Sequence, residues 1–219
     1  MLHTPESLKT YQSQLWKTKK CVDYLMERKV SLASIKLFTI GYCGDNEFSQ
    51  YYDRIVFPYR TPYGECITMQ GRAMYDWRAV NRPKYWHSKF EGGDKHSSLY
   101  GLYEIGELAL KTNALVVVEG PFDVIACYQC GIPAVAALGT SFSYKQALLA
   151  RRYTNNLYFW YDTDDAGRRG LENALGVVKD LDFDAYVVEP DTNEKDASDI
   201  YCAQGRHKIN ELVKNARQH

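Results

Sequence analysis

The chain has 219 residues with 27 basic and 27 acidic side chains, and its formal net charge is zero. This balance excludes a protein that binds nucleic acid through a strongly positive overall charge, and the length suits one large domain or two small ones. No segment has the length and apolar character of a membrane span, and the N-terminal residues lack the apolar core of a signal peptide. We therefore expect a cytoplasmic protein with no membrane partner, whose six cysteines are reduced thiols.

Helices are expected first in chain order. Residues 5–29 carry a loose apolar stripe that is typical of a helix and includes Leu15 and Leu25. Ser31 is well placed to cap a short second helix over residues 32–38.

A β-hairpin is expected next. Residues 52–60 and 65–72 flank the sequence TPYG, whose proline and glycine favour a tight turn. Residues 76–98 are polar, aromatic and basic without a clear period, and we expect extended or loop structure there. The helices and the hairpin together predict a smaller mixed α+β subdomain over residues 1–110.

The second half of the chain alternates between short apolar strands and helices. Strands are expected at 114–120, 133–139, 156–162 and 184–189, and helices at 122–131, 144–153, 166–181 and 205–216. Continuously apolar strands in this alternation are typical of a parallel sheet with helices on both faces. The sequence therefore predicts an α/β domain over residues 111–219, in which ligands bind beyond the carboxyl ends of the strands.

Acidic side chains follow three of the four predicted strands. They are Glu119, Asp123, Asp162, Asp164, Asp196 and Asp199. The spacing of Asp162 and Asp164 places both side chains on the same side of an extended segment. Uncompensated, such charges would repel and raise one another's pKa values, and a divalent cation such as Mg²⁺ would remove that difficulty.

Capping of the following helices is the alternative role for these acids. Asp123 and Asp165 are well placed for it, and for any single acid capping or solvation is a sufficient explanation. Glu119, Asp162 and Asp164 taken together favour a metal site, because parallel strands deliver all three to one edge.

Basic and aromatic residues alternate in the segment 71–90. The basic residues are Arg72, Arg78, Arg82, Lys84 and Lys89, and the aromatic residues are Tyr75, Trp77, Tyr85 and Trp86. This mixture suits single-stranded nucleic acid, since the charges follow phosphates and the rings stack on bases. From the residues alone, aromatic rings in the core with solvated charges at the rim are an equally good explanation.

The pair Cys127 and Cys130 has the spacing of a metal knuckle. A structural zinc site needs four ligands, and no second pair stands nearby in the sequence. We therefore expect no zinc.

Three motifs in the second half resemble the TOPRIM module of primases, topoisomerases and some nucleases. They are VVVEGPFDVIA at 116–126, AALGTSFS at 136–143 and YDTDDAGRRG at 161–170. Upstream, RIVFPYRTPYGECITMQGRAM, RPKYWHS and SSLYGLYE resemble the catalytic core of DnaG-type primases in the same order, and YLMERKVSLASIKLFTIGY resembles the helical segment ahead of it. The resemblance covers nearly all of residues 20–200. The stretch KDASD is most similar to the version in phage primase-helicases, which leaves Asp199 in more doubt than Asp196.

The resemblance implies a nucleotidyltransferase that synthesises short RNA primers from ribonucleoside triphosphates on single-stranded DNA, with two Mg²⁺ or Mn²⁺ ions. It makes Glu119, Asp162 and Asp164 the catalytic and metal-binding acids, and Asp123 and Asp196 supporting metal acids. Glu119 is either a ligand or the proton acceptor. The residues expected to face nucleic acid or nucleotide phosphates are Arg72, Lys84 and Lys95, to which the basic segment adds Arg82.

Other interpretations remain open at this point. The chain could be an excised fragment, a compact phage-like primase, or a relative that has lost priming. Its partners would be a replicative helicase or a zinc-bearing template-recognition protein, in a bacterial or phage-infected cell. A metal-dependent nuclease of the TOPRIM group needs the same acids but not the basic half. An accessory single-stranded-DNA-binding protein would need no acids. A topoisomerase is a weaker alternative, because this chain has no room for the separate large domain that carries the tyrosine nucleophile.

Overall fold

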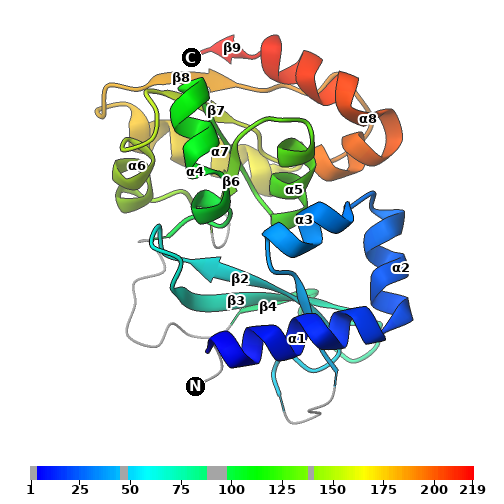
Figure 1. Cartoon of the computed structure of the whole chain (residues 1–219). Helices are drawn as coiled ribbons and strands as arrows, with labels where there is room; N and C mark the ends of the chain where they lie inside the picture. Colours follow the sequence, from blue (N-terminus) through cyan, green and yellow to red (C-terminus); the bar gives the residue numbers. More distant parts are fainter. Residues whose placement is uncertain (1–3, 45–48, 88–97, 138–140) are drawn as a thin grey trace. The chain divides into compact units, whose positions relative to one another are not determined.

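The computed structural model describes residues 4–44, 49–87, 98–137 and 141–219, and the chain divides into two compact units (Figure 1). The first unit comprises residues 1–60 and 64–93, and the second comprises residues 61–63 and 94–219. The division at residue 110 that the sequence predicts stays a prediction. No helix in the described ranges is both long and apolar enough to cross a bilayer.

The helices of the first unit are α1 (Pro5–Lys17), α2 (Lys19–Glu27) and α3 (Leu32–Leu37). The prediction of one helix over residues 5–29 is wrong, because the helix is interrupted at Thr18. There the backbone is extended (φ −109°, ψ 91°), and the Thr18 hydroxyl donates to the Gln14 carbonyl at 2.8 Å. The predicted cap of the next helix is confirmed, since Ser31 Oγ accepts a hydrogen bond from the Ser34 N–H at 3.1 Å.

An antiparallel sheet forms the rest of the first unit. Its strands, in spatial order, are β1 (Gly41–Cys43), β2 (Arg54–Arg60), β3 (Cys66–Ala73) and β4 (Tyr85–His87). The pairing of β2 with β3 confirms the predicted hairpin, and β4 lies in the segment expected to be extended or loop. Helix α1 packs closely on β1, because a Cβ at Gly41 would lie only 2.6 Å from the Tyr11 Cβ.

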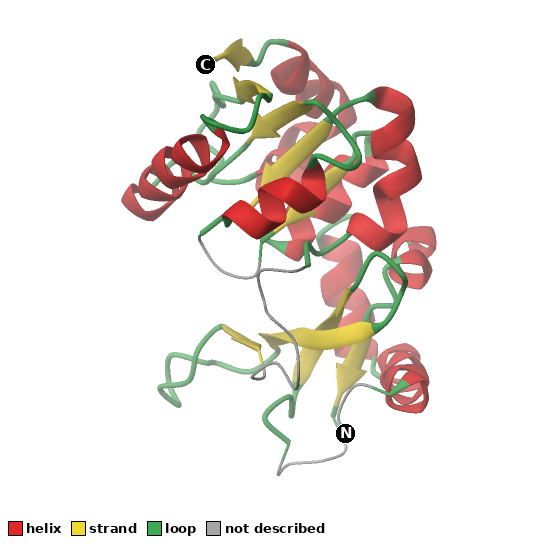
Figure 2. Ribbon diagram, turned by 90° about the vertical axis from the view of Figure 1, so that its left-hand side faces the viewer, coloured by secondary structure: helices red, strands yellow, loops and turns green. Residues whose placement is uncertain are grey.

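A five-stranded sheet forms the centre of the second unit. Its order is β6 (Ala134–Ala136), β5 (Leu115–Val118), β7 (Asn156–Phe159), β8 (Asp184–Val187) and β9 (Arg217–Gln218). The first four strands are parallel, as predicted, and the short β9 pairs antiparallel with β8 at the edge. Every residue of β5 is buried, which explains its uninterrupted apolar sequence. Helices lie on both faces of the sheet, which confirms the α/β fold (Figure 2).

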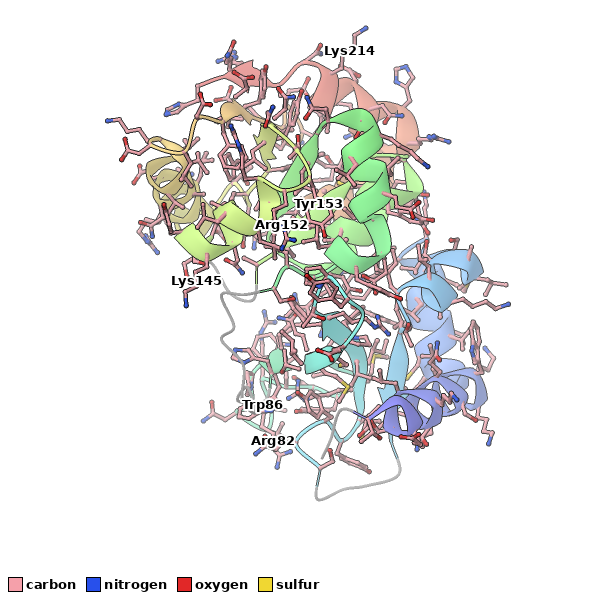
Figure 3. The ribbon with its side chains drawn as sticks, turned by 60° about the vertical axis from the view of Figure 1, so that its left-hand side comes forward. Arg82, Trp86, Lys145, Arg152, Tyr153 and Lys214 are labelled. Carbon is pink, nitrogen blue, oxygen red and sulfur yellow. The ribbon has the colours of Figure 1, made fainter. Side chains whose placement is uncertain are left out.

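Five helices lie around this sheet in the part of the chain that the structure describes. They are α4 (Leu102–Thr112), α5 (Pro121–Gln129), α6 (Tyr144–Ala150), α7 (Asp165–Val178) and α8 (Ala197–Lys214). Helix α4 was not predicted from the sequence, and its Gly106 leaves room for the ring of Tyr153, which is labelled in Figure 3. The predicted last helix also starts too late, since α8 begins at Ala197 and is kinked at Gly205, where φ is +78°.

Candidate active site

Glu119 and Asp162 lie together at the carboxyl edge of the parallel sheet. They follow β5 and β7, which are neighbouring strands, so the fold itself brings them side by side. Glu119 Oε1 accepts a hydrogen bond from the backbone N–H of Asp162 at 2.9 Å. Burial raises the pKa of the Glu119 carboxyl, and the charges of Asp162 and Asp164 raise it further. This site therefore carries concentrated negative charge.

Lys195 supplies a positive charge between the two aspartates. Its Nζ lies 2.6 Å from Asp162 Oδ2 and 3.0 Å from Asp164 Oδ2. The pKa of Asp164 is lowered, first by the hydrogen bond that its carboxylate accepts from the Gly167 N–H and then by Lys195. The sequence predicts that a cation compensates these charges, and in this structure the ammonium of Lys195 lies in that position. Lys195 compensates the charge, a role that was not predicted from the sequence.

The turn between Asp162 and α7 is tightly packed. Asp164 caps α7 by accepting from the N–H groups of Ala166 and Gly167 at 3.1 and 3.0 Å. The cap is therefore Asp164 and not Asp165, which instead pairs with Arg168 one turn into the helix. A Cβ at Gly167 would lie 2.0 Å from the Asp162 carbonyl oxygen, so only glycine fits at this position.

Asp123 and Asp196 form a second acidic pair at the starts of two helices. The buried carboxylate of Asp123 accepts from the Gly120 N–H at 3.2 Å and from the Ser198 N–H at 2.9 Å. Asp196 caps α8 by accepting from the Asp199 N–H at 2.7 Å. Burial, followed by the charge of Asp196, raises the pKa of Asp123 well above its usual range. The capping alternative is thus confirmed for both residues, and their role as metal acids stays a prediction.

The carboxylates at this edge suit a hard cation such as Mg²⁺. Among the described residues, no three Asp, Glu, His or Cys side chains are grouped so that they could hold a metal ion. The cation that contacts both Asp162 and Asp164 is instead the Lys195 ammonium, and its two short ion pairs show that positive charge is accommodated there. In chemical type, the carboxylate oxygens of Glu119, Asp162 and Asp164 are nevertheless the donors that a divalent ion prefers.

The two cysteines with knuckle spacing lie at the end of α5. Burial raises the pKa of the Cys127 thiol well above its usual range and that of Cys130 to about 11. A metal-bound cysteine is a thiolate, and this environment opposes that form.

The predicted phosphate-binding residues lie around β3 and β4 of the first unit. Arg72 stacks between the rings of Tyr24 and Tyr85, with 5.6 and 5.5 Å from its guanidinium carbon to the two centroids. Lys84 and Arg82 are exposed, and Figure 3 shows Arg82 projecting from the ribbon. Lys95 lies outside the described residues. Arg72 is therefore partly occupied by packing, and the Lys84 Nζ lies over the Tyr85 ring at 5.7 Å from its centroid, whereas Arg82 projects away from the ribbon.

Arg54 organises this surface, and the sequence analysis assigns it no role. Its buried guanidinium donates to the carbonyl oxygens of Gly71, Lys84 and Pro83 at 3.2, 3.2 and 3.0 Å, and also to the Tyr75 hydroxyl. Burial lowers its pKa, and nearby arginines add to that effect. The signal in the sequence was the pair of arginines, Arg54 and Arg60, at the two ends of an otherwise apolar strand.

A pocket of about 250 Å³ opens beside the segment that Arg54 holds. It is lined by residues from α2 and β3 and by the loop that follows β3, namely Tyr24, Arg72, Ala73, Met74, Tyr75, Asp76, Trp77 and Arg78. Arg78 lies over the Trp77 ring at 4.8 Å from the centroid. Aromatic faces and guanidinium groups thus line the same small hollow.

Comparison with known proteins identifies the family. Residues 116–201 match the Toprim-like domain family. The chain is 32% identical to the DNA primase of Haemophilus influenzae over 94% of its own length and 40% of that protein. It is 27% identical to a DnaG catalytic core, with a TM-score of 0.84 over 97% of this chain and 79% of that one.

The chain belongs to the DnaG-type primase family. This assignment confirms the resemblance and, for the second unit, the TOPRIM-like fold. A further DnaG primase catalytic domain, whose structure is known bound to single-stranded DNA, is 26% identical with a TM-score of 0.81 over 96% of this chain and 76% of that one. TOPRIM-containing primases generally use divalent metal ions. This primase-family chain spans about two fifths of the length of the Haemophilus relative.

Proposed function

We propose that this chain is the catalytic core of a DNA primase, which joins ribonucleotides into short RNA primers on a single-stranded DNA template. The observation that carries the proposal is the gathering of Glu119, Asp162 and Asp164 at the carboxyl edge of a TOPRIM-like sheet, with a cation already accommodated between the aspartates. Family membership supports the reaction class.

Two Mg²⁺ or Mn²⁺ ions are proposed as cofactors, held by Glu119, Asp162 and Asp164, with Asp123 and Asp196 in support. Bound divalent ions would supply activation of the attacking 3′-hydroxyl and stabilisation of the leaving pyrophosphate. The chain's own contribution is the fixed placement of its carboxylates. Because its pKa is raised, Glu119 also suits a proton acceptor, whose pKa should lie near the working pH.

Template and nucleotide binding are assigned to the surface around β3 and β4. We propose that Arg72, Arg82, Lys84 and Lys95 contact phosphates, with the aromatic residues between them available for stacking. The single-stranded DNA in a structural relative supports this choice of ligand. Arg54 acts as a positioning residue, because it holds both ends of the 71–84 segment.

Partners and location are extensions of the same proposal. A chain without net charge has little long-range attraction for DNA, so a replicative helicase or a zinc-bearing protein that presents the template would raise its activity. The proposed place of action is the cytoplasm of a bacterial or phage-infected cell.

The deciding experiment incubates the chain with single-stranded DNA, the four ribonucleoside triphosphates and Mg²⁺ or Mn²⁺. We expect short RNA products that disappear in EDTA and in the Asp162→Asn, Asp164→Asn double variant. Degradation of labelled DNA without nucleotide incorporation would replace this proposal with a nuclease. DNA binding that is unchanged in the double variant, without synthesis by either protein, would indicate an accessory binding protein.

A further inference from the structure

The side chain of Lys195 is the feature of the acidic site that the proposed function leaves unexplained. Its ammonium bridges Asp162 and Asp164 at 2.6 and 3.0 Å. Lys195 lies in the segment between β8 and α8, whereas both aspartates lie between β7 and α7. The bridge therefore links two successive strand ends of the sheet.

Hydrogen bonds hold the residues on both sides of Lys195, whereas its own side chain is open to solvent over about half of its surface. Asp196, the next residue, caps α8, and the Ser198 N–H donates to the buried Asp123. On the other side, Glu194 accepts from Gln204 at 3.0 Å. The side chain of Lys195 itself is 52% exposed. The ammonium can therefore leave and return while its attachment point stays in place.

A divalent ion and this ammonium cannot occupy the aspartate pair together. Mg²⁺ binds a carboxylate oxygen at about 2.0–2.1 Å. The Lys195 Nζ lies 2.6 Å from Asp162 Oδ2, so both cations on the same oxygen would be in strong repulsion. The Lys195 and Asp164 side chains are about half exposed, and ion pairs that are open to solvent are individually weak, so a divalent ion can displace the lysine even though Asp162 is only 14% exposed.

We propose that Lys195 is the resident counter-cation of the acidic site and competes with divalent metal for Asp162 and Asp164. Before metal arrives, it holds the two carboxylates together and compensates their charge. Metal binding requires the ammonium to move out, so Lys195 limits how tightly the site holds the ion. This inference deepens the proposed function and rests on it, since it takes the carboxylates to bind a divalent ion.

The test measures Mn²⁺ affinity directly, by electron paramagnetic resonance of free Mn²⁺ with the full chain. Lys195→Met removes the competing charge and keeps much of the side-chain length. We expect it to bind Mn²⁺ about three- to tenfold more tightly than the wild type, the range expected for losing two weak ion pairs. Lys195→Arg, which keeps the charge, should bind within about twofold of the wild type.

Lys208 offers a matched control. Lys208 lies on α8, and its Nζ also bridges two carboxylates, Asp191 at 2.8 Å and Glu211 at 3.1 Å. Neither carboxylate belongs to the acidic site. Lys208→Met should leave the Mn²⁺ affinity unchanged. A second readout is thermal unfolding in EDTA, where Lys195→Met should melt below the wild type and then gain more from added Mn²⁺.

The inference would be overturned if Lys195→Met bound Mn²⁺ no more tightly than the wild type. It would also be overturned if Lys208→Met gained as much Mn²⁺ affinity as Lys195→Met. If Lys195→Met fails to fold, Lys195→Gln takes its place under the same criteria. The inference and the proposed function fail separately. If the wild-type chain makes no RNA but Lys195→Met binds Mn²⁺ more tightly, only the proposed function is refuted. Unchanged affinity in a variant of an active primase would refute only the role of Lys195.

Discussion

The Asp123 carboxylate accepts a hydrogen bond from the Ser198 backbone N–H at 2.9 Å and so joins the start of α5 to the start of α8. The same carboxylate accepts from the Gly120 N–H, which makes it the shared cap of two chain segments. A buried charge is costly, as the raised pKa of Asp123 shows, and two backbone donors offset part of that cost.

The first prediction follows from this contact. Asp123→Ala leaves two backbone N–H groups without their partner, and each unsatisfied buried donor costs about 1–3 kcal/mol. The Ser198 contact is buried and the Gly120 contact is partly buried, so we expect the free energy of unfolding to fall by about 1–3 kcal/mol, measured by urea denaturation in EDTA. Alanine at the exposed Asp180 is the control and should change stability by less than about 0.5 kcal/mol. A loss below that limit in Asp123→Ala would mean that the two helix starts are held by other contacts.

The second prediction concerns the aspartate pair. Asp162→Asn combined with Asp164→Asn should abolish RNA synthesis while leaving the fold intact. In EDTA the double variant should also be less stable than the wild type, by about 0.5–1 kcal/mol, because the Lys195 ion pairs are lost. If the carboxylates were uncompensated, relief of their repulsion would give the opposite sign, a gain in stability. Circular dichroism melting in EDTA decides between the two, and a higher melting temperature in the double variant would contradict the role of Lys195 as counter-cation.

The third prediction concerns Glu119. Glutamine keeps the oxygen that accepts from the Asp162 N–H but carries no charge. We expect Glu119→Gln to lower the rate of synthesis about a hundredfold, the scale for removing a positioned acid–base group. A loss below about threefold would leave Glu119 with a packing role only.

The pH dependence of stability gives an independent check on Glu119. Since its folded-state pKa is raised, the charged carboxylate reduces stability above that pKa and has no such effect below the pKa of an ordinary glutamate. Glu119→Gln should therefore be more stable than the wild type at neutral pH in EDTA, and the difference should shrink as the pH falls. A constant difference across that range would show that the carboxylate is not penalised by its surroundings.

The fourth prediction separates two arginines near β3. Arg82→Ala should weaken single-stranded DNA binding and reduce the log–log salt slope by about 0.7, the value for one phosphate contact, with little change in stability. Arg72→Ala should also lower the melting temperature, because its guanidinium packs between two tyrosine rings. Filter binding at several salt concentrations measures the slopes, with Lys9→Ala on α1 as the control. Equal salt slopes in Arg82→Ala and the wild type would show that Arg82 is a solvated surface residue that contacts no phosphate.

The sequence correctly predicts those parts of the fold that depend on short stretches of neighbouring residues. The TPYG turn predicts the hairpin, and apolar runs followed by acids predict β5 and β7 together with Glu119 and Asp162. The break at Thr18 has no strong sequence signal, since no proline or glycine marks it. Helix α4 did carry a signal, because Leu102, Ile105 and Ala109 recur at helical spacing and are buried.

The functional contacts that the sequence analysis lacked are all long-range. Lys195 meets Asp162 only because β7 and β8 are neighbours in the sheet, and no spacing rule along the chain predicts that pairing. Arg54 likewise holds carbonyl groups across the hairpin and the loop after it. Side-chain partners of this kind depend on strand order, which periodicity does not determine.

Gly167 lies so close to the Asp162 carbonyl that the turn between β7 and α7 is tightly packed. The carboxylates of Asp162 and Asp164 are attached to this turn, so their spacing depends on how α7 lies on the sheet and not on side-chain freedom alone. A cavity made under the buried face of α7, at Ala174 or Val178, would tilt the helix and move Asp164 with it. Metal affinity should therefore respond to repacking of a helix face that never touches the ion, which gives protein engineers a means of tuning this site without altering any of its charged groups.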